Sequence, residues 1–210
     1  MTQDKILIID LDETLLSVNS FPYFARYFLC RKFPKLSPYQ RGVLWLKSAV
    51  IFAKRKIFGS SHATTKNALQ KLWKKADDVT ALENLLADLQ SKIRPNMQAV
   101  VEQIKSGESA AILASAAAAI YVKPLAQKFG FSHVIATEID GEENRAEEKR
   151  RSVLEYIEKQ GWQMRKKIFF TDHLEDLPLI AACDELVWFG KEEEILLIQK
   201  SCATAVKFAG

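Results

Sequence analysis

The chain has 210 residues, of which 48% are hydrophobic and 27% are charged, as in ordinary soluble globular proteins. This length suits one core with an insertion and is short for two independent domains. The three cysteines, Cys30, Cys183 and Cys202, lack the spacing of a zinc site or a disulfide framework. No basic-then-apolar signal segment precedes the first predicted strand, so we expect a cytoplasmic protein.

The net charge of +4 is distributed unevenly along the chain. The stretch from Leu15 to Ala76 contains 13 of the 30 Lys and Arg residues and no Asp or Glu. All 26 acids lie outside it, so this stretch carries about +13 and the rest of the chain about −9. Such opposite charges predict that the two parts meet different partners.

The first predicted strand is the aliphatic run Ile6–Ile9, and two carboxylates follow it. Asp10 and Asp12 would lie beyond the carboxyl end of the strand, where open α/β sheets bind ligands. Two acids this close repel each other unless a cation lies between them. The alternative is an acidic turn in which Asp12 or Thr14 caps the next helix.

The segment from residue 17 to about residue 95 has a helical pattern interrupted by prolines. Phe21–Leu29 is rich in aromatic residues. Val43–Ala53 is apolar on nearly every face but too short to span a bilayer. It fits either a buried helix or one lying in a membrane interface. Thr65–Leu89 predicts one or two amphipathic helices.

After Pro95, predicted strands alternate with helices, which is typical of a parallel sheet with crossover helices. The expected strands are Ser109–Ser115, His133–Ile139, Lys167–Asp172 and Leu186–Phe189, and the expected helices are Met97–Lys105, Ile120–Phe129 and Glu148–Gln160. We therefore predict an α/β fold with a Rossmann-like parallel-sheet core and a helical cap inserted after the first strand. The predicted core domain comprises residues 1–16 and 95–210, and the predicted cap comprises residues 17–94.

The first strand ends in Asp10-Leu11-Asp12-Glu13-Thr14-Leu15. This run resembles the nucleophile motif of the haloacid-dehalogenase-like (HAD) superfamily, most of whose members are Mg-dependent phosphatases. Glu13 departs from the family pattern, which usually has glycine at this position.

A second motif lies at the predicted strand that ends in Ser115. The run from Ile112 to Ala126 resembles the phosphoserine-phosphatase-like branch of the superfamily (subfamily IB), with Ala117 and Ala118 as departures. A hydroxyl beside a helix N-terminus at a strand tip would bind phosphate oxygens. The alternative is that Ser115 simply caps the helix that follows.

The third motif of the family is a lysine at the start of a helix, and Lys149 matches it best, with Arg150 and Lys123 as rivals. The alternative is a solvated charged helix face. The fourth motif is the strand that ends in Asp172, with Asp176 four residues later and then Leu-Pro-Leu. It resembles the metal-binding motif of the same branch. His173 is expected to be a loop residue, because an oxygen-rich site selects Mg²⁺.

The resemblance implies phosphomonoester hydrolysis through an aspartyl-phosphate. Asp10 would be the nucleophile, and Asp12 would be the general acid and base. Mg²⁺ would be the cofactor. Its ligands are predicted to be Asp10, Asp172 and the backbone carbonyl of Asp12, with Asp176 also at the metal site, where it could orient Lys149 or a bound water. Ser115 and Lys149 would stabilise the transferring phosphate, and the predicted substrate-binding residues are Leu11, Thr14, Ser115, Ala116 and Lys149.

The predicted cap suggests the substrate class. The cap is expected to offer no acid for a substrate amine, and the position near Asn19 lacks the glutamate of phosphoserine phosphatases. The aromatic segment, Arg31-Lys32 and the apolar helix resemble the bacterial phosphatidylglycerophosphatase branch. A lipid phosphate, with the basic cap touching an anionic membrane at its inner face, is the leading hypothesis. The alternatives are a phosphatase of small soluble esters, such as phosphoserine-like or sugar phosphates, and a catalytically silent binding module. No nucleic acid is expected, because the cap has no nucleic-acid-binding motif.

Overall fold

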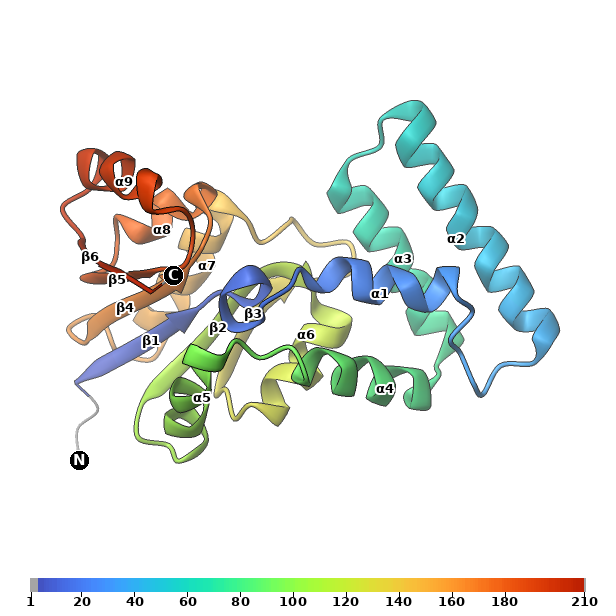
Figure 1. The fold of residues 1–210 in the computed structure, drawn as a ribbon, viewed down its shortest axis with the longest axis horizontal. Helices are drawn as coiled ribbons and strands as arrows, with labels where there is room; N and C mark the ends of the chain where they lie inside the picture. Colours follow the sequence, from blue (N-terminus) through green and yellow to red (C-terminus); the bar gives the residue numbers. More distant parts are fainter. Residues whose placement is uncertain (1–3, 210) are drawn as a thin grey trace.

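Residues 4–209 are described by the computed structural model, in which six parallel strands form one sheet with the order β3-β2-β1-β4-β5-β6 (Figure 1). The strands are β1 (Lys5–Ile9), β2 (Ala110–Ala118), β3 (His133–Thr137), β4 (Lys166–Thr171), β5 (Glu185–Trp188) and β6 (Ala205–Phe208). The helices are α1 (Ser20–Leu29), α2 (Pro38–Phe58), α3 (His62–Ala76), α4 (Val79–Gln90), α5 (Gln98–Lys105), α6 (Ala119–Lys128), α7 (Ala146–Lys159), α8 (Leu177–Ile180) and α9 (Ile195–Ser201). The predicted fold class is confirmed.

Strand β1 shows why the sheet has two covered faces. Alternate side chains of a strand point to opposite sides. Leu7 and Ile9 belong to a hydrophobic cluster that includes α5 and α6, whereas Ile6 and Ile8 belong to a second cluster with α7, α8 and α9. All four side chains are buried, which explains the uninterrupted aliphatic run in the sequence.

The strand order reverses direction at β1, and this positions the polar residues of the motifs. The chain runs from β1 to β2 and β3 on one side, and then returns to β4, β5 and β6 on the other. Asp10 follows β1, Asp172 follows β4, and Ser115 lies within the carboxyl-terminal half of β2. A reversal point of this kind leaves a crevice beyond the strand ends, where α/β proteins bind ligands.

Helices α1 to α4 form the insertion after β1 and lie beside the sheet (Figure 1). The chain leaves the sheet at Leu16 and returns at Ile93, and these two residues form an antiparallel β-bridge. The bridge lies at the predicted boundaries of the cap, although the division into two domains stays a prediction.

Aromatic side chains fill the interior of the insertion. Phe24, Phe28 and Phe33 surround Trp73 of α3 with ring centroids 5.1 to 5.7 Å apart. These four rings are buried and belong to the same hydrophobic cluster as Leu7 and Ile9. The aromatic segment of α1 is therefore internal packing that ties the insertion to the sheet.

Helix α2 buries only one of its faces, so it is not the fully buried helix that was one of the two alternatives from its sequence. Leu44 and Ser48 are buried, whereas Leu46, Val50 and Ile57 are exposed on the opposite side. Figure 1 shows α2 at the outer edge of the insertion, with α3 between it and the sheet. No helix within residues 4–209 is long and apolar enough to cross a membrane.

The expectation that the predicted cap offers no acid was wrong, because four acids follow the basic stretch. Asp77 ends α3, Asp78 caps α4, and Glu83 and Asp88 lie on α4. Asp78 accepts hydrogen bonds from the backbone N–H groups of Ala81 and Lys35, and Asp88 accepts one from the Tyr27 hydroxyl. These two acids therefore serve local structure inside the insertion.

Candidate active site

The centre of the site is an ion pair between Lys149 and two carboxylates. The Lys149 Nζ lies 3.0 Å from Asp10 Oδ1 and 2.8 Å from Asp176 Oδ1. Asp176 also accepts a hydrogen bond of 2.7 Å from the Thr171 hydroxyl. The start of α7 thus brings the predicted lysine between the carboxyl ends of β1 and β4.

The burial of this group changes its protonation. Burial raises the pKa of Asp10 to about 8, and the positive charge of Lys149 opposes the rise. Burial lowers the pKa of Lys149, but the charges of Asp10 and Asp176 outweigh it and raise the pKa above its usual value. Lys149 therefore stays positively charged.

The structure distinguishes Lys149 from its two sequence rivals. Arg150 forms an ion pair with Glu147 one turn earlier on the exposed face of α7. Lys123 forms an exposed ion pair with Glu138. Only Lys149, of these three, is buried and contacts Asp10.

Asp12 faces the beginning of α1. Its Oδ1 accepts a hydrogen bond of 2.7 Å from the backbone N–H of Ser20, while Asn19 is the N-cap residue of the helix. Burial raises the pKa of Asp12, and hydrogen bonds from Ser20 oppose the rise. Asp12 therefore bonds to the first residue of the helix, although Asn19 and not Asp12 is its N-cap, and it also lines the cavity beside Asp10.

Two of the predicted substrate-binding residues lie behind the cavity. Leu11 and Thr14 are fully buried, and neither lines the cavity. The Thr14 hydroxyl donates a hydrogen bond of 2.9 Å to Asp172 Oδ1, so it positions that carboxylate. A role for the Leu11 backbone N–H in binding phosphate stays a prediction.

Glu13 occupies the position at which the resembled family usually has glycine, and its backbone is left-handed, with φ of 57°. This conformation costs a residue with a side chain roughly 1 kcal/mol. We expect Glu13→Gly to raise the free energy of unfolding relative to Glu13→Ala by about 1 kcal/mol, measured by urea denaturation. The Ala variant controls for loss of the exposed carboxylate. Equal stability of the two variants would show that the turn is unstrained.

Ser115 is buried at the edge of the cavity, but no helix begins there. Strand β2 continues to Ala118, and α6 begins at Ala119 without a side-chain cap. The alternative N-cap role of Ser115 was therefore wrong, because Ala118 is the N-cap residue of α6, and the helix begins one residue before its predicted start at Ile120. The Ser115 hydroxyl instead accepts a hydrogen bond of 3.1 Å from the Ala117 N–H, which fixes the hydroxyl beside the cavity.

The end of β2 around Ala116 is held by side chains that the sequence did not single out. The Ala116 carbonyl accepts a hydrogen bond of 2.7 Å from the Thr137 hydroxyl and another from Lys66 of α3. Asn144 donates to the Ser115 carbonyl at 2.9 Å. The four alanines that follow Ser115 carry no polar side chain. Hydrogen bonds from Thr137, Lys66 and Asn144 therefore hold this part of the backbone in place.

The predicted catalytic acids Asp10 and Asp12 share one cavity of about 210 Å³ with residues from the insertion. Phe21, His62 and Lys66 form one wall, and Glu143 with Arg145 lies on the core side. Sequence reasoning missed these residues, because a lysine on an amphipathic helix and a glutamate in an acidic loop are usually solvated. The lining also includes Asp10, Asp12, Glu13, Asn19, Ser115, Ala116, Ala117, Lys149, Asp172, His173, Glu175 and Asp176.

The carboxylates of the site suit a divalent cation. Four acids, Asp10, Asp12, Asp172 and Asp176, face one buried lysine, which leaves a negative excess in a largely dehydrated region. Burial raises the pKa of Asp172 as well, and the Thr14 hydrogen bond opposes the rise. Hard oxygen donors in negative excess fit Mg²⁺. Both oxygens of Asp176 are bound by Lys149 and Thr171, whereas Asp10, Asp12 and Asp172 each have a described hydrogen bond at Oδ1 only.

Within the part of the chain that the structure describes, no three Asp, Glu, His or Cys side chains form a metal site by themselves. A cation held by Asp10 and Asp172 would therefore need a further ligand oxygen that does not come from an Asp or Glu side chain. The backbone carbonyl of Asp12, predicted from the motif, lies on the same turn. Its role, and a direct role for Asp176, stay predictions.

The fold and the site together define a class of protein: a Rossmann-like α/β core with helices inserted after β1, and a buried lysine paired with a carboxylate at the carboxyl end of that strand. A family model described as haloacid dehalogenase-like hydrolase matches residues 7–181, which is most of the chain. The protein belongs to this family, and the predicted enzyme type is confirmed at that level. A search of curated protein sequences found no match.

Several solved structures share the fold. A protein of unknown function from Bordetella pertussis Tohama I has 18% identity and a TM-score of 0.68, with 98% of each chain covered. A probable phosphoserine phosphatase from Vibrio cholerae has 14% identity and a TM-score of 0.63, covering 98% of this chain and 61% of the other. A substrate-bound phosphoserine phosphatase has 13% identity and a TM-score of 0.56, with coverages of 98% and 94%. At these identities the similarity establishes the fold.

Proposed function

We propose that the protein is a Mg²⁺-dependent phosphomonoesterase that works through an aspartyl-phosphate on Asp10. The observation that carries the proposal is the contact of Asp10 with Lys149 at 3.0 Å at the floor of a cavity that Asp12 and Ser115 also line. A carboxylate beside a buried cation can attack phosphorus, and the cation offsets the charge of the phosphate oxygens.

The reaction would proceed in two steps, transfer of the phosphoryl group to Asp10 and hydrolysis of the aspartyl-phosphate. An Asp10 oxygen forms a bond to phosphorus while the ester P–O bond breaks, and Asp12 gives its proton to the leaving oxygen. Asp12 then takes a proton from water as the water oxygen bonds to phosphorus and the Asp10–phosphate bond breaks. The raised pKa of Asp12, caused by burial, favours the protonated form that the first step needs.

Ser115 and Lys149 would hold the transferring oxygens during both steps. The Ser115 hydroxyl accepts from Ala117 N–H and keeps its own hydrogen for phosphate. The cation that Asp10 and Asp172 would hold supplies screening between the carboxylates and the phosphate. Thr14 orients Asp172, and Asp176 orients Lys149, both through hydrogen bonds.

The favoured substrate is a lipid phosphate such as phosphatidylglycerophosphate, bound at the inner face of an anionic membrane. The support is the exposed apolar face of α2, which contains Leu46, Val50 and Ile57, together with Lys47 and Lys54 beside it. Apolar side chains flanked by lysines suit a helix lying in a lipid interface. The cavity of about 210 Å³ would hold only the phosphorylated head group of such a lipid, with the acyl chains outside.

A double substitution on α2 tests the lipid substrate. We expect Leu46→Glu with Ile57→Glu to lower phosphate release from phosphatidylglycerophosphate in anionic vesicles by at least about tenfold, because two apolar contacts are lost and two negative charges are added. Hydrolysis of soluble glycerol 3-phosphate should be unchanged. Met164→Glu is the matched control, because Met164 is an exposed apolar residue outside the insertion.

Three outcomes would separate the alternatives. Activity on soluble esters but not on the lipid would keep the phosphatase and make the insertion a specificity lid. An equal loss in the double variant and in Met164→Glu would contradict a specific membrane role for α2. No Mg²⁺-dependent hydrolysis of any phosphomonoester would favour the catalytically silent binding module.

A further inference from the structure

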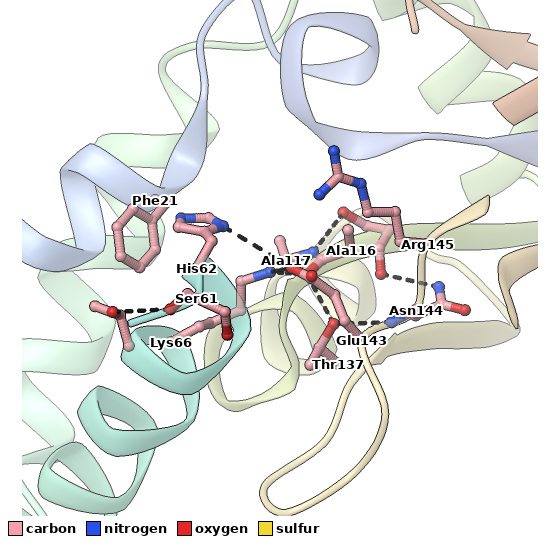
Figure 2. Close-up of polar contacts among 12 residues, drawn as sticks. Phe21, Ser61, His62, Lys66, Ala116, Ala117, Thr137, Glu143, Asn144 and Arg145 are labelled. Carbon is pink, nitrogen blue, oxygen red and sulfur yellow. Dashed lines mark hydrogen bonds and ion pairs between the residues drawn. The ribbon is translucent and has the colours of Figure 1, made fainter. Parts of the chain in front are cut away.

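Lys66 is the one lysine of α3 whose side chain enters the cavity wall within the described part of the chain. Its side chain is 3% exposed. The Nζ donates to Glu143 Oε1 at 2.6 Å and to the carbonyl of Ala116, the residue after Ser115 (Figure 2). A cation from the insertion is therefore held beside the residue that would bind phosphate.

His62 lies one turn before Lys66 and faces the same carboxylate. Its Nδ1 is 3.9 Å from Glu143 Oε1, and its ring packs edge-on against Phe21 at 4.5 Å (Figure 2). Burial lowers the pKa of His62, and the charge of Lys66 lowers it further, so the imidazole is neutral at pH 7. Phe21 and His62 add a neutral aromatic edge to this wall.

Two ion pairs border this part of the cavity. Lys66 of the insertion pairs with Glu143 of the core, and Arg145 pairs with Glu175, both from the core. A carboxylate on the leaving group would have to displace Glu143 from Lys66. An ammonium group on the leaving group would have to displace Lys66 from Glu143. Breaking a buried pair leaves the other charge unpaired, which is unfavourable. This wall therefore disfavours leaving groups with a charge next to the ester.

The pair still offers hydrogen bonds to a neutral group. An ammonium has three N–H donors, and two of those on Lys66 have acceptors, Ala116 and Glu143. Within residues 4–209, Glu143 Oε2 has no hydrogen-bond partner. One donor and one acceptor thus lie side by side, which is what a hydroxyl group needs, since it both donates and accepts.

We propose that Lys66 and Glu143 select phosphomonoesters whose leaving alcohol has a hydroxyl on the carbon next to the ester carbon, as in glycerol phosphate. The hydroxyl would donate to Glu143 Oε2 and accept from Lys66. Its place near the ester follows from the contact of Lys66 with Ala116, adjacent to Ser115. This inference rests on the proposed function and names the head-group chemistry, which a lipid head group and a free polyol phosphate share.

The test compares two soluble esters of the same carbon length, glycerol 3-phosphate and propyl phosphate, which lacks both hydroxyls. We expect kcat/KM for the unchanged protein to favour glycerol 3-phosphate by about tenfold or more. Propyl phosphate would leave Lys66 and Glu143 Oε2 without the hydrogen bonds that the hydroxyl provides. Glu143→Ala and Lys66→Met should bring the ratio close to one. Glu143→Gln, which keeps the shape and an amide oxygen, should retain part of the preference.

Glu142→Gln is the matched control, because this neighbouring glutamate is 81% exposed and lies outside the cavity lining. It should leave the ratio unchanged. Melting temperatures identify any variant that fails to fold. The kcat/KM ratio of the two esters is compared only among folded variants, and the conservative Glu143→Gln is expected to be one of them.

The result that overturns the inference is a ratio near one in the unchanged protein, or a ratio that Glu143→Ala and Lys66→Met leave unaltered. A preference for phosphoserine, which has an ammonium group in place of that hydroxyl, over glycerol 3-phosphate would also overturn it. In each case hydrolysis of p-nitrophenyl phosphate would show that the proposed phosphatase stands. If p-nitrophenyl phosphate and every other ester are inert, the proposed function itself fails. Phosphatidylglycerophosphate and glycerol 3-phosphate, compared under the same conditions, distinguish the lipid source from the free one.

Discussion

Asp10→Asn is expected to reduce Mg²⁺-dependent phosphate release by at least about a thousandfold, because an amide cannot form the acyl-phosphate bond. The fold should remain, since asparagine has the shape of aspartate and Asp176 still pairs with Lys149. Phosphate release with and without Mg²⁺, together with circular dichroism, measures both results.

Asp10→Asn is also expected to change how the stability of the metal-free protein depends on pH. Burial raises the pKa of Asp10 from 3.8 to about 8. The unfolded carboxyl therefore ionises before the folded one, and the free energy of unfolding falls as pH rises through this window. Asparagine does not titrate, so the variant should melt no lower than the unchanged protein at pH 8. Retained Mg²⁺-dependent turnover above about a tenth of the normal rate would remove Asp10 from the role of nucleophile.

Lys149→Met should have the second large effect. Methionine has a similar length and no charge, so Asp10 and Asp176 would lose the cation that lies within 3.0 Å of both. Removing one partner of a buried pair costs about 3–5 kcal/mol of stability. Loss of a charge that stabilises the transferring phosphate should lower kcat by a further 10²–10³-fold, roughly.

Arg150→Met is the matched control, because Arg150 is the next residue of α7 and its pair with Glu147 is exposed. Exposed pairs of this kind contribute little, so we expect neither activity nor melting temperature to change measurably. Similar losses in both variants would indicate that α7 itself had been disturbed. Asp176→Asn should reproduce part of the Lys149→Met effect, because Asp176 holds the lysine in place.

The alternation of strands and helices after Pro95 made the sheet predictable. The aliphatic runs were long enough to identify, and five of the six strands described within residues 4–209 correspond to predicted ones. Strand β6 was missed because Ala205–Phe208 is a short and largely exposed edge strand with little apolar pattern. Helices α8 and α9 were missed because each is too short to show a helical period.

The motif residues of the site were predictable for a different reason. Asp10, Asp12, Lys149 and Asp172 belong to short sequence runs, and the sheet brings these runs together. Lys66 and Glu143 are 77 residues apart, and no local pattern connects them. A possible signal was the position of Lys66 beside Leu69 and Trp73 on the buried face of α3, which a solvated lysine would avoid.

Two alternatives in the sequence were decided by packing, which sequence patterns do not specify. Ser115 could have capped the next helix, but β2 continues to Ala118 and α6 begins only at Ala119. The apolar run in α2 fitted either a buried helix or one lying in a membrane interface, and α1 and α3 cover only one of its faces. Which face stays open depends on the tertiary arrangement alone.

The bridge between Leu16 and Ile93 has a consequence for how such proteins diversify. Because the chain leaves and rejoins the sheet at neighbouring points, a replacement of everything between them alters neither the order of the strands nor the position of Asp10. Evolution can therefore exchange the recognition module while the reactive groups are inherited unchanged. Grafting residues 17–92 onto the core of a relative would transfer Lys66 but not its partner Glu143, which belongs to the core. The preference for a hydroxyl-bearing leaving alcohol would therefore be transferred only if Glu143 were introduced as well.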